Sequence, residues 1–280
     1  MVEIPKHSMT PMDRYCVFGN PIAHSKSPLI HAEFASLTQQ QLSYDKQLVA
    51  EDQFPQAVAE FRRQGGQGAN VTLPFKQQAF ELCDGLTDRA RLSGAVNTLY
   101  WQGDQLWGDN TDGEGLVRDL LRNGVELKGC RILLIGAGGA VRGVIPSLFE
   151  QQPQSIVVAN RTQAKAETLA QHFAELGDIS SCAMDEIDGA FDLIINGTSA
   201  SLSSTALPVN ADVIQRAKCC YDMAYGSEPT VFQQQAKQLG VSKSLDGLGM
   251  LIQQAAVSFE RWRGVTPDPQ PVYDLIKRQL

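Results

Sequence analysis

An apolar strand that runs directly into a glycine-rich loop is the feature that most constrains this fold. Residues 132–135 are followed by Gly136, Ala137, Gly138, Gly139 and Ala140. Such a loop turns tightly and directs its backbone N–H groups, with the positive end of the following helix, at a pyrophosphate. We therefore expect these five residues to bind a nucleotide cofactor in a Rossmann-like fold. Val141 replaces the last glycine or alanine of the usual pattern, so a methyltransferase loop and a purely structural turn stay open as alternatives.

The residues after the next predicted strand indicate which nicotinamide cofactor fits. Residues 155–159 run into Asn160, Arg161 and Thr162, with Lys165 one helical turn further on. An acidic residue at this point would accept from a ribose 2′-hydroxyl and repel a 2′-phosphate, whereas Arg161 pairs with that phosphate and Thr162 donates to it. We therefore predict NADP rather than NAD. The alternative is that Arg161 is only a solvated residue at a strand end.

Composition limits the partners of this chain. Its 280 residues are 43% hydrophobic, enough for a substantial core and two domains, and its net charge of -7 argues against a nucleic-acid surface. The cysteine and histidine spacing predicts no metal site, and reduced thiols fit the cytoplasm. No apolar run has the length of a signal-peptide core or a membrane span, so we expect no membrane partner. We therefore expect a small-molecule partner. The oligomeric state stays open between a monomer and a homodimer.

Short apolar runs alternate with helical patterns along the chain, which favours parallel βαβ units and an α/β fold. The predicted strands lie near residues 15–18, 42–49, 69–72, 95–101, 131–135, 155–159, 191–195 and 219–221. The predicted helices lie near residues 28–37, 53–64, 75–83, 113–122, 248–263 and 271–278, the first with Ser27 as its N-cap. We expect a frayed extension before Asp13 and a polar loop at Ser199–Ser204.

Two domains with a cleft between them follow from this order of elements. We expect an N-terminal α/β substrate-binding catalytic domain made of residues 1–111 with 247–280. A Rossmann-like NADP-binding domain would span residues 112–246. Lys76 would come from one domain and the glycine loop from the other, so the cleft is expected to close on the cofactor.

Four polar segments lie at predicted strand ends in the N-terminal half. They are Ser25-Lys26-Ser27-Pro28, Asn70–Lys76, Ala95–Thr98 and Gly108–Gly113. Because ligands of open α/β sheets bind outside the carboxyl ends of the strands, these segments could enclose a polyhydroxylated acid. Singly, each group has a structural explanation, with Ser27 and Asp112 as helix caps and Asn97 as a turn former.

Eight segments in a fixed order resemble those of the shikimate dehydrogenase family over nearly the whole chain. They are residues 18–28, Asn-Val-Thr-x-Pro-x-Lys, Gly-Ala-Val-Asn-Thr, Gly-Asp-Asn-Thr-Asp-Gly, Gly-Ala-Gly-Gly-Ala, Asn-Arg-Thr, Tyr221-Asp222-Met223-x-Tyr225 and residues 246–251. The resemblance implies an NADP-dependent oxidoreductase of aromatic amino-acid biosynthesis. Its reaction would be the reversible NADPH-dependent reduction of 3-dehydroshikimate to shikimate.

The resemblance also implies a substrate role for each matching residue. Ser25 and Ser27 would bind the substrate carboxylate, and Lys76 and Asp112 would flank the reacting C3 oxygen. The hydroxyls would be held by Thr72, Asn97, Asp112 and Gln254. Gln254 is chosen over the adjacent Gln253 because it falls three residues after Leu251 in the family pattern Gly-Met-Leu-x-x-Gln-Ala.

Further residues are expected near the cofactor on the same grounds. The backbone around Met223 and Gly247 and the ring of Tyr225 would lie near the nicotinamide and the substrate. Asp88 matches a position sometimes assigned to cofactor contact, although a carboxylate at a helix start explains it equally well. Lys165 stands where some relatives carry a second Arg, and its amine lacks the planar guanidinium fork, so the preference for NADP would be less steep.

Lys76 is the predicted proton-transfer residue, since a buried amine loses its proton readily, although Asp112 would favour the ammonium form. The alternative makes Lys76 an orienting group and places Asp112 on the proton path. Three other functions stay open. An NAD-using quinate/shikimate dehydrogenase would carry an acidic residue in place of Asn160-Arg161-Thr162, and a folate-linked methylene dehydrogenase would not need the Ser-x-Ser pair. A non-catalytic NADP sensor could lose Lys76 or Asp112.

Overall fold

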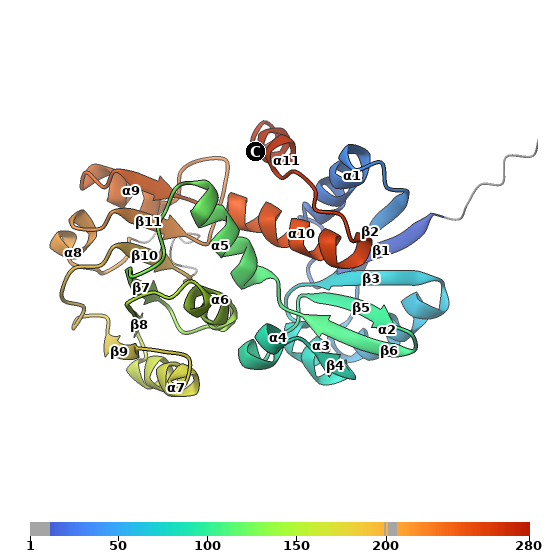
Figure 1. Cartoon of the computed structure of the whole chain (residues 1–280), viewed down its shortest axis with the longest axis horizontal. Coiled ribbons are helices and arrows are strands. Elements are labelled where there is room, and N and C mark those ends of the chain that lie inside the picture. The colour runs from blue at the N-terminus through green and yellow to red at the C-terminus, as the bar shows by residue number, and fades with distance from the viewer. Residues whose placement is uncertain (1–11, 199, 201–205) are drawn as a thin grey trace, which may run out of the picture.

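The computed structural model describes residues 12–198, 200 and 206–280. The expectations for the segment before Asp13 and for Ser199–Ser204 lie outside these residues, apart from Met12 and Ala200. The described part of the chain forms two six-stranded sheets side by side along the long axis of the molecule (Figure 1). The predicted fold class, an N-terminal α/β domain plus a Rossmann-like domain, is confirmed.

The first sheet and its helices come from the N-terminal half. Its strands are β1 (Asp13–Gly19), β2 (Leu42–Leu48), β3 (Gly66–Val71), β4 (Gly85–Leu86), β5 (Thr98–Gln102) and β6 (Gln105–Asp109). Between them lie α1 (Ser27–Leu37), the 3-10 helix η1 (Glu51–Gln53), α2 (Phe54–Arg63), α3 (Lys76–Leu82) and α4 (Asp88–Ser93). The strand order is β2-β1-β3-β5-β6-β4.

This sheet is mixed, so the expectation of parallel βαβ units is wrong for part of it. β1 is parallel to β2 and β3, but β5 is antiparallel to both β3 and β6. Only Gly103 and Asp104 separate β5 from β6, and a two-residue turn joins antiparallel strands because a parallel crossover needs a dozen residues or more. Gly103 has a positive φ of 61°, the left-handed conformation that such a turn requires.

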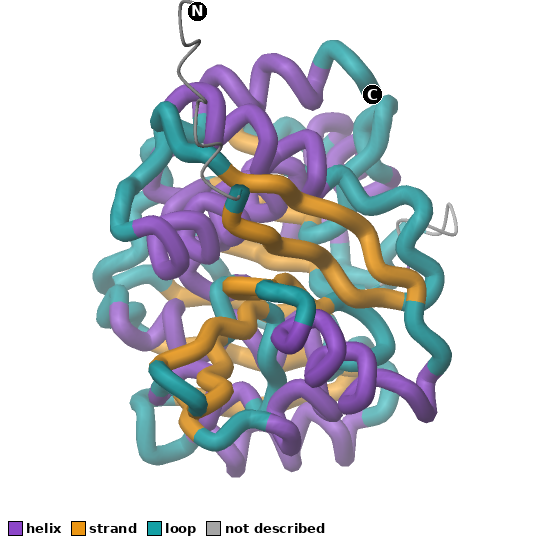
Figure 2. Tube along the Cα trace, turned by 90° about the vertical axis from the view of Figure 1, so that its right-hand side faces the viewer, coloured by secondary structure: helices purple, strands orange, loops and turns teal. Residues whose placement is uncertain are grey.

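Helices cover both faces of the first sheet. Tyr15 and Val17 of β1 pack with residues of α1, α10 (Leu248–Arg263) and α11 (Gln270–Lys277), while Cys16 and Phe18 pack on the opposite face with α2 and α3. This alternation follows from the two-residue period of a strand. Figure 2 shows the strands of this half between helices. β1 is therefore buried on both faces, and this packing holds its carboxyl end in place.

The second sheet is fully parallel. It contains β7 (Arg131–Ile135), β8 (Ser155–Asn160), β9 (Ile179–Ala183), β10 (Leu193–Asn196), β11 (Cys219–Asp222) and β12 (Lys243–Leu245). Its helices are α6 (Gly139–Glu150), α7 (Gln163–Phe173), α8 (Ala211–Gln215) and α9 (Val231–Gln238). The strand order is β12-β11-β10-β7-β8-β9. From β7 the chain adds strands first on one side (β8, β9) and then on the other (β10, β11, β12), so a switch point lies between β7 and β10, where such sheets bind dinucleotides.

Two long helices lie between the sheets in Figure 1, namely α5 (Asp112–Arg122) and α10. They pack closely because Gly115 of α5 has no side chain: a Cβ there would lie 2.7 Å from the backbone nitrogen of Gln254. The hydroxyl of Tyr221 in β11 donates to Asp119 of α5 over 2.9 Å, which ties α5 to the second sheet. Among the described helices, none is both long and apolar enough to cross a membrane.

Candidate active site and cofactor cleft

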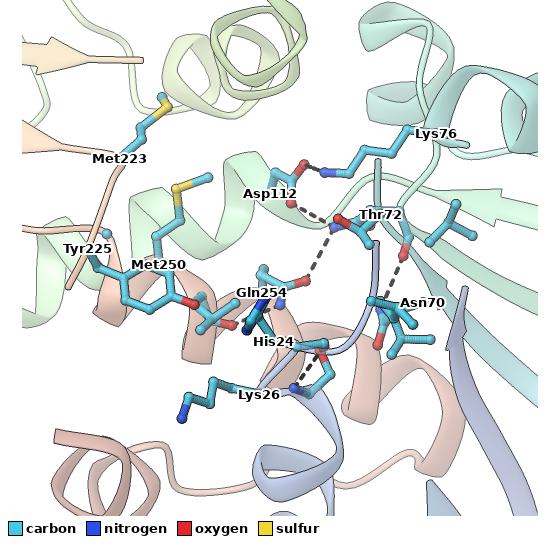
Figure 3. Close-up of a pocket in the computed structure, with 18 of the residues that line it drawn as sticks. His24, Lys26, Asn70, Thr72, Lys76, Asp112, Met223, Tyr225, Met250 and Gln254 are labelled. Atoms are coloured by element: carbon cyan, nitrogen blue, oxygen red, sulfur yellow. Dashed lines mark hydrogen bonds and ion pairs between the residues drawn. The ribbon is translucent and has the colours of Figure 1, made fainter. Parts of the chain in front are cut away.

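A cavity of about 320 Å³ opens between the two sheets, and residues from both halves of the chain line it (Figure 3). Ten of the residues predicted from the sequence are part of its wall: Ser25, Ser27, Thr72, Lys76, Asn97, Asp112, Met223, Tyr225, Gly247 and Gln254. They are brought together because the carboxyl ends of β1, β3 and β6 meet the start of the antiparallel strand β5 at one edge of the first sheet.

Ser25 and Ser27 stand at the start of α1. The expectation that Ser27 caps this helix is wrong: Lys26 is the N-cap, no side chain caps the helix, and Ser27 is already its first residue. The Ser25 hydroxyl accepts from the backbone N–H of Ser27 over 3.3 Å. Both hydroxyls border the cavity beside the positive end of a helix of 11 residues, which suits a carboxylate.

Lys76 and Asp112 form an ion pair inside the cavity. Lys76 Nζ lies 2.5 Å from Asp112 Oδ2, and the two side chains are 29% and 14% exposed. Asp112 is the first residue of α5, but Thr111 is its N-cap, so the carboxylate of Asp112 is directed at Lys76 rather than used as a cap. Burial strengthens such a charge-assisted contact relative to one at the surface.

The side chain of Asn97 connects this ion pair to α10. Its Nδ2 donates to Asp112 Oδ1 over 2.8 Å and lies 3.3 Å from Gln254 Oε1. Its Oδ1 accepts from the backbone N–H of Thr111 over 2.9 Å. Gln254 donates to the carbonyl of Leu251 over 2.8 Å, whereas the adjacent Gln253 does not line the cavity. The result is a cluster of polar groups suited to ring hydroxyls.

The opposite wall comes from the second half of the chain. Figure 3 shows Met223 and Tyr225 across the cavity from Lys76 and Thr72. Gly247 approaches Met223 so closely that a Cβ would lie 2.1 Å from the Met223 carbonyl oxygen, so only glycine fits there. Burial raises the pKa of Tyr225, which keeps its hydroxyl neutral at physiological pH.

A second cavity, of about 610 Å³, lies at the carboxyl edge of the second sheet and fits a nucleotide cofactor. It is lined by Gly136, Ala137, Gly138, Asn160 and Arg161 among others. A Cβ built at Gly138 or Gly139 would meet no atom within 4 Å, so the loop leaves open space above the start of α6. Gly136 has a φ of 110°, the left-handed conformation that turns the loop away from β7.

The departure at Val141 has a structural explanation. Val141 is fully buried, and it occupies the space beneath Gly197, which follows β10. A Cβ on Gly197 would lie only 2.4 Å from Val141 Cγ2. In the usual pattern a glycine on the helix allows close packing of helix and strand. Here the helix carries the valine, and the facing loop carries the glycine instead.

The residues predicted to select NADP lie at the carboxyl end of β8. Arg161, Thr162 and Lys165 are exposed, and Asn160 Nδ2 donates to the Thr162 carbonyl over 2.9 Å, which fixes the turn. Asn160 and Arg161 line the second cavity. Lys165, on the first turn of α7, does not line it, and neither do Gly139, Ala140 and Thr162.

Asp88 is placed away from both cavities. It is the first residue of α4, its side chain is 92% exposed, and it pairs with Arg91 of the same helix at 2.6 Å. The helix-start explanation for this carboxylate therefore fits its surroundings. Thr198 is a residue that the sequence analysis missed: it follows β10 beside the switch point and lines the second cavity. Its position after a strand end was the signal that could have identified it.

Three family models match successive parts of the chain. The shikimate dehydrogenase substrate binding domain matches residues 17–99, shikimate / quinate 5-dehydrogenase matches residues 119–219, and the shikimate 5'-dehydrogenase C-terminal domain matches residues 247–277. The model boundaries leave residues 100–118 between the first two matches. Asp112 lies in this gap. The evidence for its ion pair with Lys76 therefore comes from the structure and not from the family models.

Individual relatives agree with the family models. The shikimate dehydrogenase (NADP(+)) of Colwellia psychrerythraea is 54% identical over 268 residues, which is 96% of this chain and 98% of the relative. The solved Ael1 enzyme from Pseudomonas putida is 42% identical with a TM-score of 0.90, over 94% of this chain and 97% of that one. The shikimate 5-dehydrogenase of Thermus thermophilus, solved with NADP(H) and shikimate, is 33% identical with a TM-score of 0.86, over 96% and 100%. The chain therefore belongs to the shikimate dehydrogenase family.

Proposed function

We propose that this chain is an NADP-dependent shikimate dehydrogenase, which reversibly reduces 3-dehydroshikimate to shikimate in the pathway to chorismate and the aromatic amino acids. One observation carries the proposal: the Lys76–Asp112 ion pair lies in a cavity that also presents Ser25 and Ser27. A cation beside a carboxylate suits a reacting alcohol or ketone, and paired hydroxyls at a helix start suit a carboxylate. Together they match a small hydroxy acid.

Each polar group then has a role toward the substrate. The carboxylate is bound by the hydroxyls of Ser25 and Ser27. The ring hydroxyls are held by Thr72, Asn97, Asp112 and Gln254, whose side chains border the same cavity as Tyr225. Hydrogen bonds from several directions orient the ring, which converts binding into a fixed geometry for reaction.

Lys76 and Asp112 handle the proton. When a carbonyl at C3 is reduced, the Lys76 amine donates a proton to the carbonyl oxygen, and when the alcohol is oxidised it takes that proton back. Asp112 holds the amine in place through the 2.5 Å contact. NADPH, when bound, supplies the hydride. In the alternative, Lys76 orients the substrate oxygen and Asp112 lies on the proton path, so the same two side chains are involved.

The second cavity holds the cofactor in this proposal. The backbone of Gly136, Ala137, Gly138, Gly139 and Ala140 accommodates the pyrophosphate at the start of α6. Arg161 pairs with the 2′-phosphate, aided by Asn160, Thr162 and Lys165. Met223 and Gly247 flank the nicotinamide, because they line the cavity that contains Lys76. For Asp88 we propose no cofactor contact, in view of its exposure and its pairing with Arg91.

The division into domains is part of the same proposal. Residues 1–111 with 247–280 form the substrate-binding domain, and residues 112–246 form the cofactor-binding domain. The two sheets, which lie within residues 13–109 and 131–245, support this division. We place the enzyme in the cytoplasm. For the oligomeric state we propose a homodimer, and sedimentation equilibrium tests it against the single-chain mass of 30.6 kDa.

The function is tested by following absorbance at 340 nm with shikimate or quinate, each paired with NADP or NAD. We expect the highest kcat/KM with shikimate and NADP. Dominant activity with quinate and NAD would support the broader quinate/shikimate enzyme instead. Inactivity with all four pairs, in protein that binds NADP, would favour the non-catalytic sensor.

A further inference from the structure

A largely buried amide forms part of the wall of the substrate cavity. Asn70, near the carboxyl end of β3, is 6% exposed and lines the cavity, and its amide is hydrogen-bonded to several protein groups (Figure 3). Its Oδ1 is 3.1 Å from His31 Nε2 and accepts from the Tyr44 hydroxyl over 2.7 Å. Its Nδ2 contacts the Asn97 carbonyl at 3.1 Å and Thr98 Oγ1 at 3.2 Å. Asn70 thus joins α1 and β2 to the catalytic side of the first sheet.

The orientation of this amide determines the tautomer of His31. The carbonyl of Asn97 can only accept, so the nitrogen of the Asn70 amide must face it and the oxygen must face His31. An oxygen acceptor requires a donor, and His31 must therefore carry a proton on Nε2. Its Nδ1 is buried and has no hydrogen-bond partner among the described residues.

The surroundings of His31 keep its ring neutral. The ring is fully buried and stacks on Tyr44 with centroids 4.3 Å apart and planes 8° apart. Phe34 and Trp262 also contact it, at centroid distances of 6.1 Å and 5.2 Å. Burial lowers the pKa of His31 to about 3, and the hydrogen bond to Asn70 opposes this only in part. A neutral ring has one N–H, which is the one directed at Asn70.

From His31, a chain of hydrogen bonds runs to Asp112 of the catalytic ion pair, and each donor up to Asp112 points toward that carboxylate. His31 donates to Asn70 Oδ1. Asn70 Nδ2 donates toward Thr98 Oγ1, directly or through Ser258 Oγ, which lies 3.0 Å from the amide nitrogen and 2.8 Å from Thr98 Oγ1. Thr98 then donates to Asn97 Oδ1 over 2.8 Å, and Asn97 Nδ2 donates to Asp112 Oδ1 over 2.8 Å. Asp112 Oδ2 accepts from Lys76. Each bond sets the direction of the next, because an amide or hydroxyl that accepts a hydrogen bond on its oxygen directs its own N–H or O–H elsewhere.

We propose that His31 is a positioning residue, which fixes the Asn70 amide and thereby orients Asn97 toward Asp112 and Lys76. The inference rests on the proposed function, since it assigns the ion pair a task that His31 assists. His31 does not itself line the cavity, and it reaches the cavity wall only through Asn70. Its Nδ1 has no hydrogen-bond partner among the described residues, which costs free energy, while its single N–H is directed at Asn70.

Two substitutions at His31 distinguish the effect of its N–H donor from the effect of its buried ring. His31→Gln retains an Nε2 donor at similar reach, whereas His31→Leu keeps an apolar side chain without a donor. We expect His31→Leu to lower kcat for shikimate oxidation about 10-fold, since small misplacements of catalytic groups cost one to two orders of magnitude, while KM for NADP stays within about twofold. His31→Gln should recover kcat to within about threefold of the native value. Equal losses in the two variants, or a native kcat in a folded His31→Leu variant, would overturn the proposal.

The tautomer provides a test in the native protein that does not depend on folding of a variant. In 15N NMR spectra of the histidine ring, we expect His31 to show the pattern of a neutral ring protonated at Nε2, unchanged between pH 6 and pH 8. The signal is assigned by its absence from His31→Gln. A proton on Nδ1, or a charged ring, would overturn the proposal. Inactivity of the native enzyme on shikimate would instead count against the proposed function and leave the tautomer result as it stands.

Discussion

Lys76 and Asp112 form their 2.5 Å ion pair at the first residues of two different helices, α3 and α5. The positive end of a helix stabilises a carboxylate and opposes an ammonium ion. The carboxylate of Asp112 therefore lies at the end of α5 that attracts it, and the Lys76 amine is held by that carboxylate. This arrangement holds the Lys76 amine in a fixed place in the cavity, where it can exchange a proton with a substrate oxygen.

Removal of the Lys76 amine tests this role. Lys76→Met keeps the aliphatic chain and removes the proton donor, so kcat for shikimate oxidation should fall about 100-fold or more, the range of lost acid–base catalysis. KM for NADP should stay nearly unchanged, because Lys76 does not line the second cavity. Steady-state kinetics measure both. Lys128→Met, at an exposed lysine outside both cavities, is the matched control. Near-normal turnover in Lys76→Met would contradict the assignment.

The preference for NADP should depend on Arg161. In Arg161→Ala, the ratio of kcat/KM for NADP to that for NAD should fall by a factor equivalent to about 1–3 kcal/mol, typical of a lost hydrogen bond to a charged group. Lys165→Ala should reduce the ratio less, because Lys lacks the planar fork of Arg and Lys165 does not line the second cavity. An unchanged ratio in Arg161→Ala would show that Arg161 is only a solvated residue that follows β8.

Local patterns in the sequence were enough to predict the four central strands of the second sheet, because a strand, glycine turn and helix such as residues 131–150 are specified by neighbouring residues. β9 and β12 were missed: their residues are mostly half-exposed, so they lack the apolar run that marked the central strands. Antiparallel β6 was missed because it ends in Gly108 and Asp109, residues that are typical of turns.

The members of the active site were more predictable than their contacts. Family motifs indicated Asn97 and Gln254, but they are 157 positions apart, and no spacing rule predicts that they share a hydrogen bond. The orientation of Asn97 also depends on Thr98 and Asn70, which lie in the predicted polar segments but were given no role of their own. Such networks depend on the packing of several elements, which only the folded chain displays.

Gly197 and Val141 should be energetically coupled. Gly197→Ala places a Cβ 2.4 Å from Val141 Cγ2, and overpacking of this kind costs about 1–3 kcal/mol of unfolding free energy. KM for NADP should rise as well, since the displaced valine lies next to the glycine loop. The double variant with Val141→Ala removes the clash and should recover part of the loss. Urea unfolding of the two single variants and the double variant measures the coupling, and additive losses would show that the contact is unimportant.

His31 should make the stability of the protein depend on pH. Burial lowers its pKa from the ordinary value of 6.5 to about 3 in the folded chain. Between these values the unfolded chain binds a proton that the folded chain does not, so the free energy of unfolding decreases as the pH falls below about 6.5. At pH 5 the decrease from this residue should be about 2 kcal/mol relative to pH 8. Because His31→Gln has no group that titrates in this range, it should lose about 2 kcal/mol less than the native protein between pH 8 and pH 5. Urea unfolding of both proteins at the two pH values measures the difference, and identical pH dependence would mean that His31 titrates normally in the folded state.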